Sequence, residues 1–326
     1  MTDNPLVTAV VDWYRTDHRS FPWRDTDVTP WGILVSEVMS HQTQMSRVVP
    51  RWREFMHRWP TPAAAASASD AQILRVWDRL GYPRRALALR QCAIAIVERH
   101  GGRVPADREA LQALAGIGPY TSAAVCSFAF GMRVPVVDTN VRRVIARAVH
   151  GDEVAWRPHA RRDENEMVAL LPRAAEDVQP WNAGAMELGA TICRQRKPDC
   201  VRCPIAELCQ WRGAGYPALP AAELERRQVR QARFVGSNRQ RRGRVMAVAR
   251  GSHGGLAVDQ LWERILLDTD FRAPSKPAEL LVEREQHLAA LDSLIAEGML
   301  EQRDNWLSLP GDPGPQNGEC PVHSNE

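Results

Sequence analysis

Apolar residues recur every three to four positions through most of the first 210 residues of the chain, and strand-like alternation is nearly absent there. Breakers and capping residues such as Pro60, Asp70, Gly81 and Asp107 separate the apolar segments. We therefore expect an all-helical domain. The pattern predicts helices at residues 7–14, 31–39, 73–80, 86–97, 111–114, 120–130, 141–149 and 181–192.

The pattern changes after Cys209, where a segment rich in Ala, Pro and Gly is typical of a linker. Helical patterns then follow at residues 241–249, 258–266 and 285–297, before a glycine and a short apolar stretch. Three helices followed by a small hairpin is the order of a winged-helix module, which is related to the helix-turn-helix DNA-binding proteins.

These patterns divide the chain into consecutive parts. We expect a helical domain at 1–215 with a cysteine loop at 193–209, a linker at 216–235, a winged-helix-like domain at 236–310 and a disordered tail at 311–326. The start of the chain lacks a basic segment followed by an apolar one, and no apolar run approaches the roughly 18 to 20 residues that span a bilayer. We expect no membrane association and a cytoplasmic protein.

The charge is nearly balanced. The chain has 42 Lys and Arg against 39 Asp and Glu, for a net charge of +3, so attraction to phosphate must come from local patches. Nine arginines lie between residues 226 and 250, with no acid between Glu225 and Asp259. This stretch favours an auxiliary contact with a phosphate backbone.

Four of the seven cysteines fall within 17 residues, with intervening lengths of six, two and five: Cys193, Cys200, Cys203 and Cys209. Without a secretory signal, such clustering favours metal ligation over disulfides. Four thiolates in one compact loop suit a four-iron four-sulfur cluster, with one sulfur on each iron. Zinc remains the alternative, although it more often uses two C-x2-C pairs. Cys92 and Cys126 are expected in the core, and Cys320 in the tail.

Residues 107–130 predict a helix, a tight Gly-Ile-Gly turn and a second helix. Gly116 and Gly118 permit backbone conformations closed to other residues, and the turn directs N–H groups and a helix N-terminus outward, where they can bind a phosphate. A simple reversal of direction is the alternative for such a turn. The cysteine loop adds three cations suited to phosphate contact: Arg194, Arg196 and Lys197.

Two acids stand out. Asp138 follows an apolar run and precedes a predicted helix, so it can cap that helix and serve as a pre-oriented anion. Glu37 sits among Ile33, Leu34 and neighbouring apolar residues, where burial should raise its pKa and make it a general acid. The alternative is a structural glutamate paired with His41.

With these motifs in order, residues 5–210 resemble the helix-hairpin-helix glycosylases that carry an iron-sulfur cluster, the endonuclease III superfamily, and within it the MutY adenine glycosylases. The resemblance rests on FPWRD (21–25), SEVMSHQTQ (36–44), RLGYPRRA (79–86), LAGIGPYTSAA (114–124), VVDTNVRRV (136–144), MELGATIC (186–193) and the cysteine loop. It implies a two-lobed fold with a cluster loop.

The resemblance also implies roles for the acids. The residue that matches Glu37 protonates adenine, and the one that matches Asp138 stabilises the sugar cation, placed with help from Asn140. Tyr120 occupies the position of the lysine that forms a Schiff base in bifunctional relatives, which implies a monofunctional enzyme. Four residues resemble an adenine pocket, namely Arg19, Phe21, Trp23 and Arg24. Three resemble the wedge that probes the opposite base, namely Gln42, Thr43 and Tyr82.

The expected function is hydrolysis of the N-glycosidic bond of adenine mispaired with 8-oxoguanine or guanine in duplex DNA, by a monomer in the bacterial cytosol that associates with the nucleoid. Two features depart from the family. The polar position in the helix before the cysteine loop corresponds to Ala183, and the segment after residue 236 does not resemble the Nudix-like domain that inspects 8-oxoguanine. The alternatives are a glycosylase of the same fold for another base and a cluster-bearing winged-helix regulator.

Overall fold

The computed structural model describes residues 4–227, 233–269 and 271–313. The chain folds into two compact units, and neither is continuous in sequence. The first unit comprises Met1–Val38 and Val104–Gln231, and the second comprises Met39–Arg103 and Ala232–Glu326. The sequence predicts consecutive domains instead, because apolar periodicity does not reveal which helices pack together. Among the described helices, none is long and apolar enough to cross a membrane.

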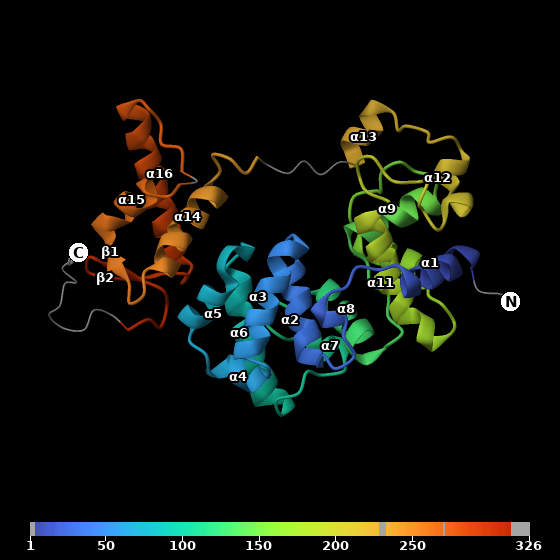
Figure 1. Cartoon of the computed structure of the whole chain (residues 1–326), viewed down its shortest axis with the longest axis horizontal. Coiled ribbons are helices and arrows are strands. Elements are labelled where there is room, and N and C mark those ends of the chain that lie inside the picture. The colour runs from blue at the N-terminus through green and yellow to red at the C-terminus, as the bar shows by residue number, and fades with distance from the viewer. Residues whose placement is uncertain (1–3, 228–232, 270, 314–326) are drawn as a thin grey trace. The chain divides into compact units, whose positions relative to one another are not determined.

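The first unit is built almost entirely of helices (Figure 1). Its core lies where α1, α9 and α11 pack together, and its fully buried side chains include Val10, Val141, Trp181 and Leu188. The elements are α1 (Pro5–Thr16), η1 (Pro22–Arg24), α2 (Pro30–Ser40, which continues into the second unit), α7 (Arg108–Gln112), α8 (Pro119–Phe130), α9 (Thr139–Ala148), α10 (Ala160–Ala169), α11 (Ala175–Thr191), η3 (Ala206–Leu208), α12 (Gln210–Gly213) and α13 (Ala221–Arg227).

The second unit combines four helices from the early part of the chain with the C-terminal module. The helix α5 begins with a capping box, in which Ser69 and Gln72 satisfy each other's backbone N–H groups. The elements are α3 (Met45–Arg58), α4 (Pro62–Ser67), α5 (Asp70–Trp77), η2 (Asp78–Leu80), α6 (Arg84–His100), α14 (Asn238–Gly251), β1 (Leu256–Ala257), α15 (Val258–Leu266), α16 (Pro277–Ala296), β2 (Glu301–Arg303) and β3 (Trp306–Ser308).

The C-terminal module has the predicted order of three helices and a hairpin, with one strand added. The strand β1 precedes α15 and pairs with β3, so the antiparallel sheet has the order β1-β3-β2. Leu307 of β3 is fully buried and is paired with Leu256 on one side and with Gln302 on the other. A strand of two residues carries too little alternation to be recognised in the sequence.

The mainly helical fold confirms the prediction from periodicity, and each of the eight predicted segments of the first domain lies in or overlaps a helix. Five α-helices were not predicted: α3, α4, α10, α12 and α13. In α3, Pro50 lies inside the helix, and the buried residues Val48, Trp52 and Phe55 alternate with charged ones. In α10 the buried residues are Asp163 and Met167, too few to form an apolar pattern.

Two segments expected to lack structure make specific contacts. Within the predicted linker, Arg227 of α13 is buried and pairs with Asp152 at 2.7 Å. At the start of the predicted tail, Asp312 pairs with Arg75 at 2.5 Å. Residues 228–232 of the linker and 314–326 of the tail, including Cys320, lie outside the described residues.

The helix α11 approaches α9 so closely that one position requires glycine. A Cβ atom built on Gly189 would lie 2.7 Å from the Cβ of Asn140 and 2.8 Å from its carbonyl oxygen. Real side chains do not come this close, so a larger residue would push the two helices apart.

We expect Gly189→Ala to lower the free energy of unfolding by about 1–3 kcal/mol, because the added methyl meets backbone atoms that cannot move aside. The matched control is Gly243→Ala in α14, where a Cβ atom meets nothing within 4 Å and alanine should stabilise the helix slightly. Urea denaturation of both variants checks this, and equal stability of the two would contradict the packing described.

Candidate functional site

The side chain of Glu37 projects from the middle of α2, a helix of the first unit with mostly apolar neighbours. The Tyr120 hydroxyl, from the first turn of α8, donates a hydrogen bond of 3.1 Å to the Glu37 carboxylate. The same hydroxyl oxygen lies 4.0 Å from the sulfur of Met186 on α11. Side chains from three helices thus come together around the Tyr120 hydroxyl.

Burial raises the pKa of Glu37 from 4.5 to about 7, and the nearby charge of Asp138 adds to the increase, whereas the Tyr120 hydroxyl and Arg24 oppose it. The pKa of Tyr120 is raised well above its ordinary value by burial and by both acids. Tyr120 therefore remains a neutral hydrogen-bond donor, and Glu37 can hold a proton near neutral pH. The expected pKa shift of Glu37 is present in the structure.

Asp138 is the N-cap of α9. Its carboxylate accepts the backbone N–H groups of Asn140 and Val141 at 2.8 and 2.7 Å, and the side-chain amide of Asn140 at 2.7 Å. Burial raises the pKa of Asp138, and these donors, with the charge of Arg143, counteract part of the increase. The capping role that the sequence predicts is present, and the same hydrogen bonds fix the orientation of the Asp138 carboxyl.

The extended segment before Asp138 is held by a buried amide. Asn182 of α11 accepts the N–H of Val136 at 3.2 Å and donates to the carbonyl of Val134 at 2.8 Å and to the hydroxyl of Ser127 at 2.9 Å. Every one of its hydrogen bonds is internal to the first unit. Asn182 was not predicted as a site residue, because its partners lie 46 to 55 residues away in the sequence.

Arg143 connects the capping group to the cysteine loop. Its guanidinium donates to the Asn140 side chain, to the carbonyl of Gly189 and to the carbonyl of Cys193, each at 2.7 Å. Asn140, which binds Asp138, and Cys193, the first cysteine of the loop, therefore accept hydrogen bonds from the same side chain. A planar guanidinium can do this because its N–H groups point in fixed directions.

Arg19 and Arg24, two residues of the expected base pocket, converge on a third charged side chain. Glu187 of α11, which is 2% exposed, pairs with Arg19 at 2.5 Å and with Arg24 at 2.9 Å. Although burial alone would raise it, these two arginines hold the pKa of Glu187 below its ordinary value. Phe21 and Trp23 stack with ring centroids 5.0 Å apart. The structure thus brings the four predicted pocket residues together around an ionised glutamate.

The helix before the cysteine loop has alanine at the position where the family often carries a polar residue, and a charged residue lies one turn further on. Ala183 is buried at 6% exposure, whereas Glu187, one turn further along α11, meets the arginines. Both occur in the motif WNAGAMELG, and helical spacing does not tell which side of α11 faces residues 19–24. The departure at Ala183 stays a prediction, and Glu187 is an additional polar residue that the sequence analysis did not select.

The hairpin between α7 and α8 has the predicted turn, with one correction. Gly116 has φ of +75°, a conformation that favours glycine, but Gly118 has φ of −91°, which any residue adopts. Gly118 is the N-cap of α8, and Ile117 between the two glycines is buried. The open N-terminus of α8 at this turn keeps the geometry of a phosphate site.

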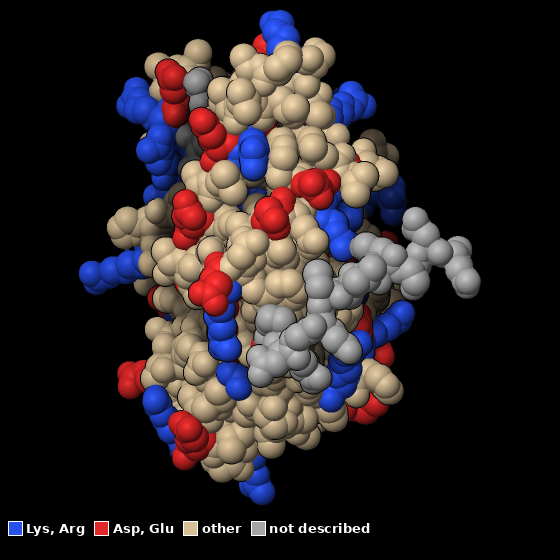
Figure 2. Space-filling view, turned by 90° about the vertical axis from the view of Figure 1, so that its left-hand side faces the viewer, with Lys and Arg blue, Asp and Glu red and all other residues tan. Residues whose placement is uncertain are grey.

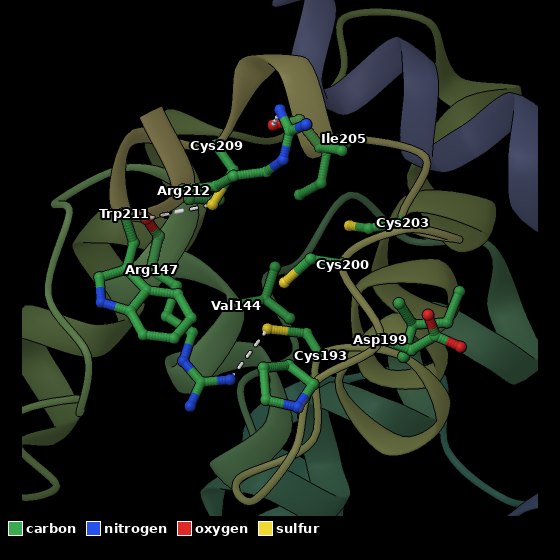
Figure 3. Close-up of a pocket in the computed structure, with 14 residues that line it drawn as sticks. Val144, Arg147, Cys193, Asp199, Cys200, Cys203, Ile205, Cys209, Trp211 and Arg212 are labelled. Atoms are coloured by element: carbon green, nitrogen blue, oxygen red, sulfur yellow. Dashed lines mark hydrogen bonds between the residues drawn. The ribbon is translucent and has the colours of Figure 1, made fainter. Parts of the chain in front are cut away.

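The four clustered cysteines line one pocket of the first unit, with walls formed by Val144, Ile205 and Trp211 (Figure 3). Arg147 donates to the sulfur of Cys193 at 3.5 Å, and its guanidinium lies 4.6 Å from the centroid of the Trp211 ring. Among the described residues, no three metal-binding side chains are gathered closely enough to hold a single ion. Cys92 and Cys126 are fully buried, as expected.

The loop between the first two cysteines exposes its three cations to solvent: Arg194, Arg196 and Lys197. The Arg194 side chain donates to the carbonyl of Lys197 at 3.3 Å. Arg147 donates to the carbonyls of Arg194 and Gln195 from beneath the loop. The loop therefore presents positive charge on a backbone that is held from inside.

The predicted wedge residues lie in the second unit. The Tyr82 hydroxyl donates to the Gln42 side chain at 3.0 Å, and the Thr43 hydroxyl donates to the carbonyl of Leu80 at 3.3 Å. Gln42 and Tyr82 have φ of 52° and 50°, a strained backbone for residues other than glycine. The structure brings these three residues together, although they are about 40 positions apart in the sequence.

The arginine-rich stretch is less available for phosphate than its composition suggests. Arg241 pairs with Glu283 at 2.7 Å, and Arg242 pairs with Glu297 within the C-terminal module. Basic and acidic side chains are interspersed on the face of the molecule seen in Figure 2. The acids that pair with Arg241 and Arg242 lie 42 and 55 residues further along the chain, so the local sequence cannot reveal them.

Residues 35–167 match the family described as HhH-GPD superfamily base excision DNA repair protein. The chain is 44% identical over 306 residues to a protein from Mycobacterium tuberculosis named adenine DNA glycosylase, with 94% of this chain and 93% of that protein covered.

Two solved structures have a similar fold. A thermostable thymine-DNA glycosylase has a TM-score of 0.57 at 31% identity, covering 64% of this chain and 95% of that one. A trapped covalent intermediate of endonuclease III with DNA has a TM-score of 0.56 at 22% identity, covering 65% of this chain and 96% of that one. The second likeness shows the fold alone.

We expect Glu37→Gln to be more stable than the parent protein at alkaline pH. A carboxyl with a raised pKa in the folded state penalises folding as the pH rises from 4.5 towards 7, and the full penalty is present above 7. Relative to the parent, the free energy of unfolding of the variant should be about 1–2 kcal/mol higher near pH 8, after allowance for solvent screening, and unchanged near pH 4.5.

Thermal denaturation across this pH range measures the difference. The matched control is Glu98→Gln, an exposed position on α6, which should show no such pH dependence. A constant difference between Glu37→Gln and the parent at every pH would contradict a raised pKa.

Proposed function

Because the chain belongs to the family of the adenine DNA glycosylases, as its identity with a family member along nearly the whole length shows, we propose that it hydrolyses the N-glycosidic bond of adenine in double-stranded DNA. The observation that carries the proposal is the Glu37 carboxyl, with a pKa of about 7 and a hydroxyl donor 3.1 Å away. A carboxyl of this kind can donate a proton at neutral pH.

Adenine is a poor leaving group until a ring nitrogen carries a proton. In the proposed reaction Glu37 transfers its proton to the extruded adenine, the bond to C1′ of the sugar breaks, and its electron pair leaves with the base. Water then adds to C1′ and loses a proton, so that C1′ carries a hydroxyl in place of the base. The released proton can return to the Glu37 carboxylate. Tyr120 keeps the carboxyl oriented throughout, because its own pKa is too high for it to ionise.

Asp138 is placed to stabilise the positive charge that develops on the sugar. Its carboxylate is held by three N–H donors, so it is oriented before the reaction and does not rotate during it. Asn140 acts as a positioning residue for Asp138, and Arg143 in turn holds Asn140.

The adenine would be recognised by Arg19, Arg24 and Glu187, with Phe21 and Trp23 supplying aromatic surface. A carboxylate can accept a hydrogen bond from the exocyclic amino group of adenine, and a guanidinium can donate to a ring nitrogen. The Glu187 ion pairs keep that acceptor ionised and fixed. The position of Tyr120 where bifunctional relatives carry a lysine supports simple hydrolysis without a Schiff base.

We propose that the cysteine pocket holds a four-iron four-sulfur cluster bound by Cys193, Cys200, Cys203 and Cys209. The donor set fits, since four thiols line one pocket and the ligands of a cubane bind different irons, farther apart than ligands of a single ion. The bound cluster supplies cross-links among its four ligands. Arg147 and Arg143 hold the loop from inside, so that its exposed cations can contact the DNA backbone.

The base opposite the adenine is proposed to be 8-oxoguanine or guanine, probed by Gln42, Thr43 and Tyr82, while the α7–α8 hairpin binds a phosphate. The protein is proposed to act as a monomer in the bacterial cytosol, on nucleoid DNA. The paired positions of Gln42 and Tyr82, both with positive φ, support a preformed wedge.

We expect single-turnover adenine release from duplexes with A opposite 8-oxoguanine or G, and a roughly 100-fold or greater loss in Glu37→Gln, because general acid catalysis is removed. With subsaturating enzyme, the parent rate should fall as the pH rises through about 7, where Glu37 loses its proton. In Tyr120→Phe the fall should shift to higher pH, since the hydroxyl that favours the anion is gone.

Glu98→Gln is the control and should keep the parent rate. Borohydride should trap no covalent DNA adduct with the parent. Full activity of Glu37→Gln would overturn the assignment of Glu37, and so would a rate that is flat between pH 6 and 9, because this interval spans the titration of the carboxyl near pH 7.

The purified protein should contain about four iron and four sulfide per chain, with the broad visible absorbance of a cubane. Cys203→Ser should lose most of both, because Cys203 lines the pocket, whereas Cys126→Ser, in the core and away from the loop, should keep them. Metal analysis and absorbance measure this, and stoichiometric zinc without iron would refute the cluster.

A further inference from the structure

The C-terminal module is anchored to the α5 helix within the second unit. The Arg75 guanidinium binds Asp312 through two hydrogen bonds, of 2.8 and 2.5 Å, and it also donates to the carbonyl of Arg250. The N–H of Ala71 donates to the carbonyl of Pro310 at 3.0 Å. The side chain of Asp312 is 5% exposed, so this is a largely desolvated bidentate pair.

A second ion pair lies closer to the wedge. Arg84 at the start of α6 pairs with Glu297 at 3.0 Å, and Glu297 also binds Arg242 of α14. The residues of α14 therefore have a defined place beside residues 82–84.

This docking brings one α14 side chain to the wedge. Arg239, in the first turn of α14, donates to the Tyr82 hydroxyl at 3.2 Å, and that hydroxyl donates to Gln42 at 3.0 Å. The Arg239 guanidinium also lies 5.0 Å from the centroid of the Phe234 ring. Three polar side chains from three separate segments form one chain of hydrogen bonds at the surface.

Arg239 differs from the neighbouring arginines of α14 in its partners. Arg241 and Arg242 are paired with glutamates, whereas no carboxylate pairs with Arg239 among the described residues. Its side chain is exposed, and one of its hydrogen bonds goes to a neutral hydroxyl. A guanidinium with free donors beside a wedge is suited to the acceptor edge of a guanine-type base.

We propose that Arg239 is a specificity-determining residue that recognises the base opposite the adenine by donating a hydrogen bond to the O6 atom of that base. The docked C-terminal module holds Arg239 in position for this contact. The proposal rests on the proposed function of the wedge. O6 is common to guanine and 8-oxoguanine, while cytosine presents an amino group at its corresponding edge. The module thereby contributes to selection of the substrate without a catalytic role.

The test measures single-turnover adenine release by the full-length protein from duplexes with A opposite 8-oxoguanine, G or C. In Arg239→Ala the rate on the first two should fall roughly ten-fold while the rate on A opposite C stays unchanged. Arg284→Ala, an exposed arginine on α16 of the same module, is the matched control and should leave all three rates unchanged.

Two more variants test whether the anchor at Arg75 positions Arg239. Arg75→Ala loosens the anchor of the module and should reduce the same two rates. The double variant Arg75→Ala with Arg239→Ala should be little slower than Arg239→Ala alone, because both substitutions remove the same contribution of Arg239. Thermal denaturation verifies that the variants are folded.

The outcomes separate the two proposals. If the parent protein releases no adenine from any duplex, the proposed function fails. If the parent is active but Arg239→Ala keeps the parent's preference, or loses activity equally on all three duplexes, the reading role of Arg239 is wrong, and the second result would make it a phosphate contact.

Discussion

The close contact between α9 and α11 is the constraint on which the site depends. At this contact Gly189 of α11 lies against Asn140, the residue that orients Asp138. The carbonyl of Gly189 accepts a hydrogen bond from Arg143, which also binds Asn140 and the carbonyl of Cys193. One helix–helix approach therefore fixes the proposed anion of the active site and the first residue of the cysteine loop at the same time.

The two buried glutamates of the site differ in pKa because they have different hydrogen-bond partners. Glu37 and Glu187 both lie in the first unit, yet the pKa of one is raised and that of the other is lowered. Glu187 has two arginines, whereas the hydrogen bond that Glu37 accepts comes from a neutral hydroxyl. The fold thereby maintains one carboxyl as a proton donor and one as a hydrogen-bond acceptor at the same pH.

The parts of the site that could be predicted are those written in short contiguous motifs. The four cysteines lie in one loop, so local spacing was enough to select them, whereas the roles of Asp138 and Asn140 came from the family resemblance of the short motif that contains both. Glu187 and Asn182 were missed because their partners are 46 to 168 residues away. The same limit applies to Arg241 and Arg242 of α14, whose glutamate partners lie 42 and 55 residues away.

The anchor between Arg75 and Asp312 also has a consequence for synthesis of the protein. The helices α3 to α6 emerge early from the ribosome, but the carboxylate that Arg75 binds belongs to the last part of the described chain. The second unit can therefore be completed only after residue 312 has been synthesised, across a long loop whose closure costs entropy. A product cut short before residue 310 would lack both the carboxylate that binds Arg75 and the carbonyl that accepts the N–H of Ala71, so α5 would have lost two of the contacts that hold the C-terminal module.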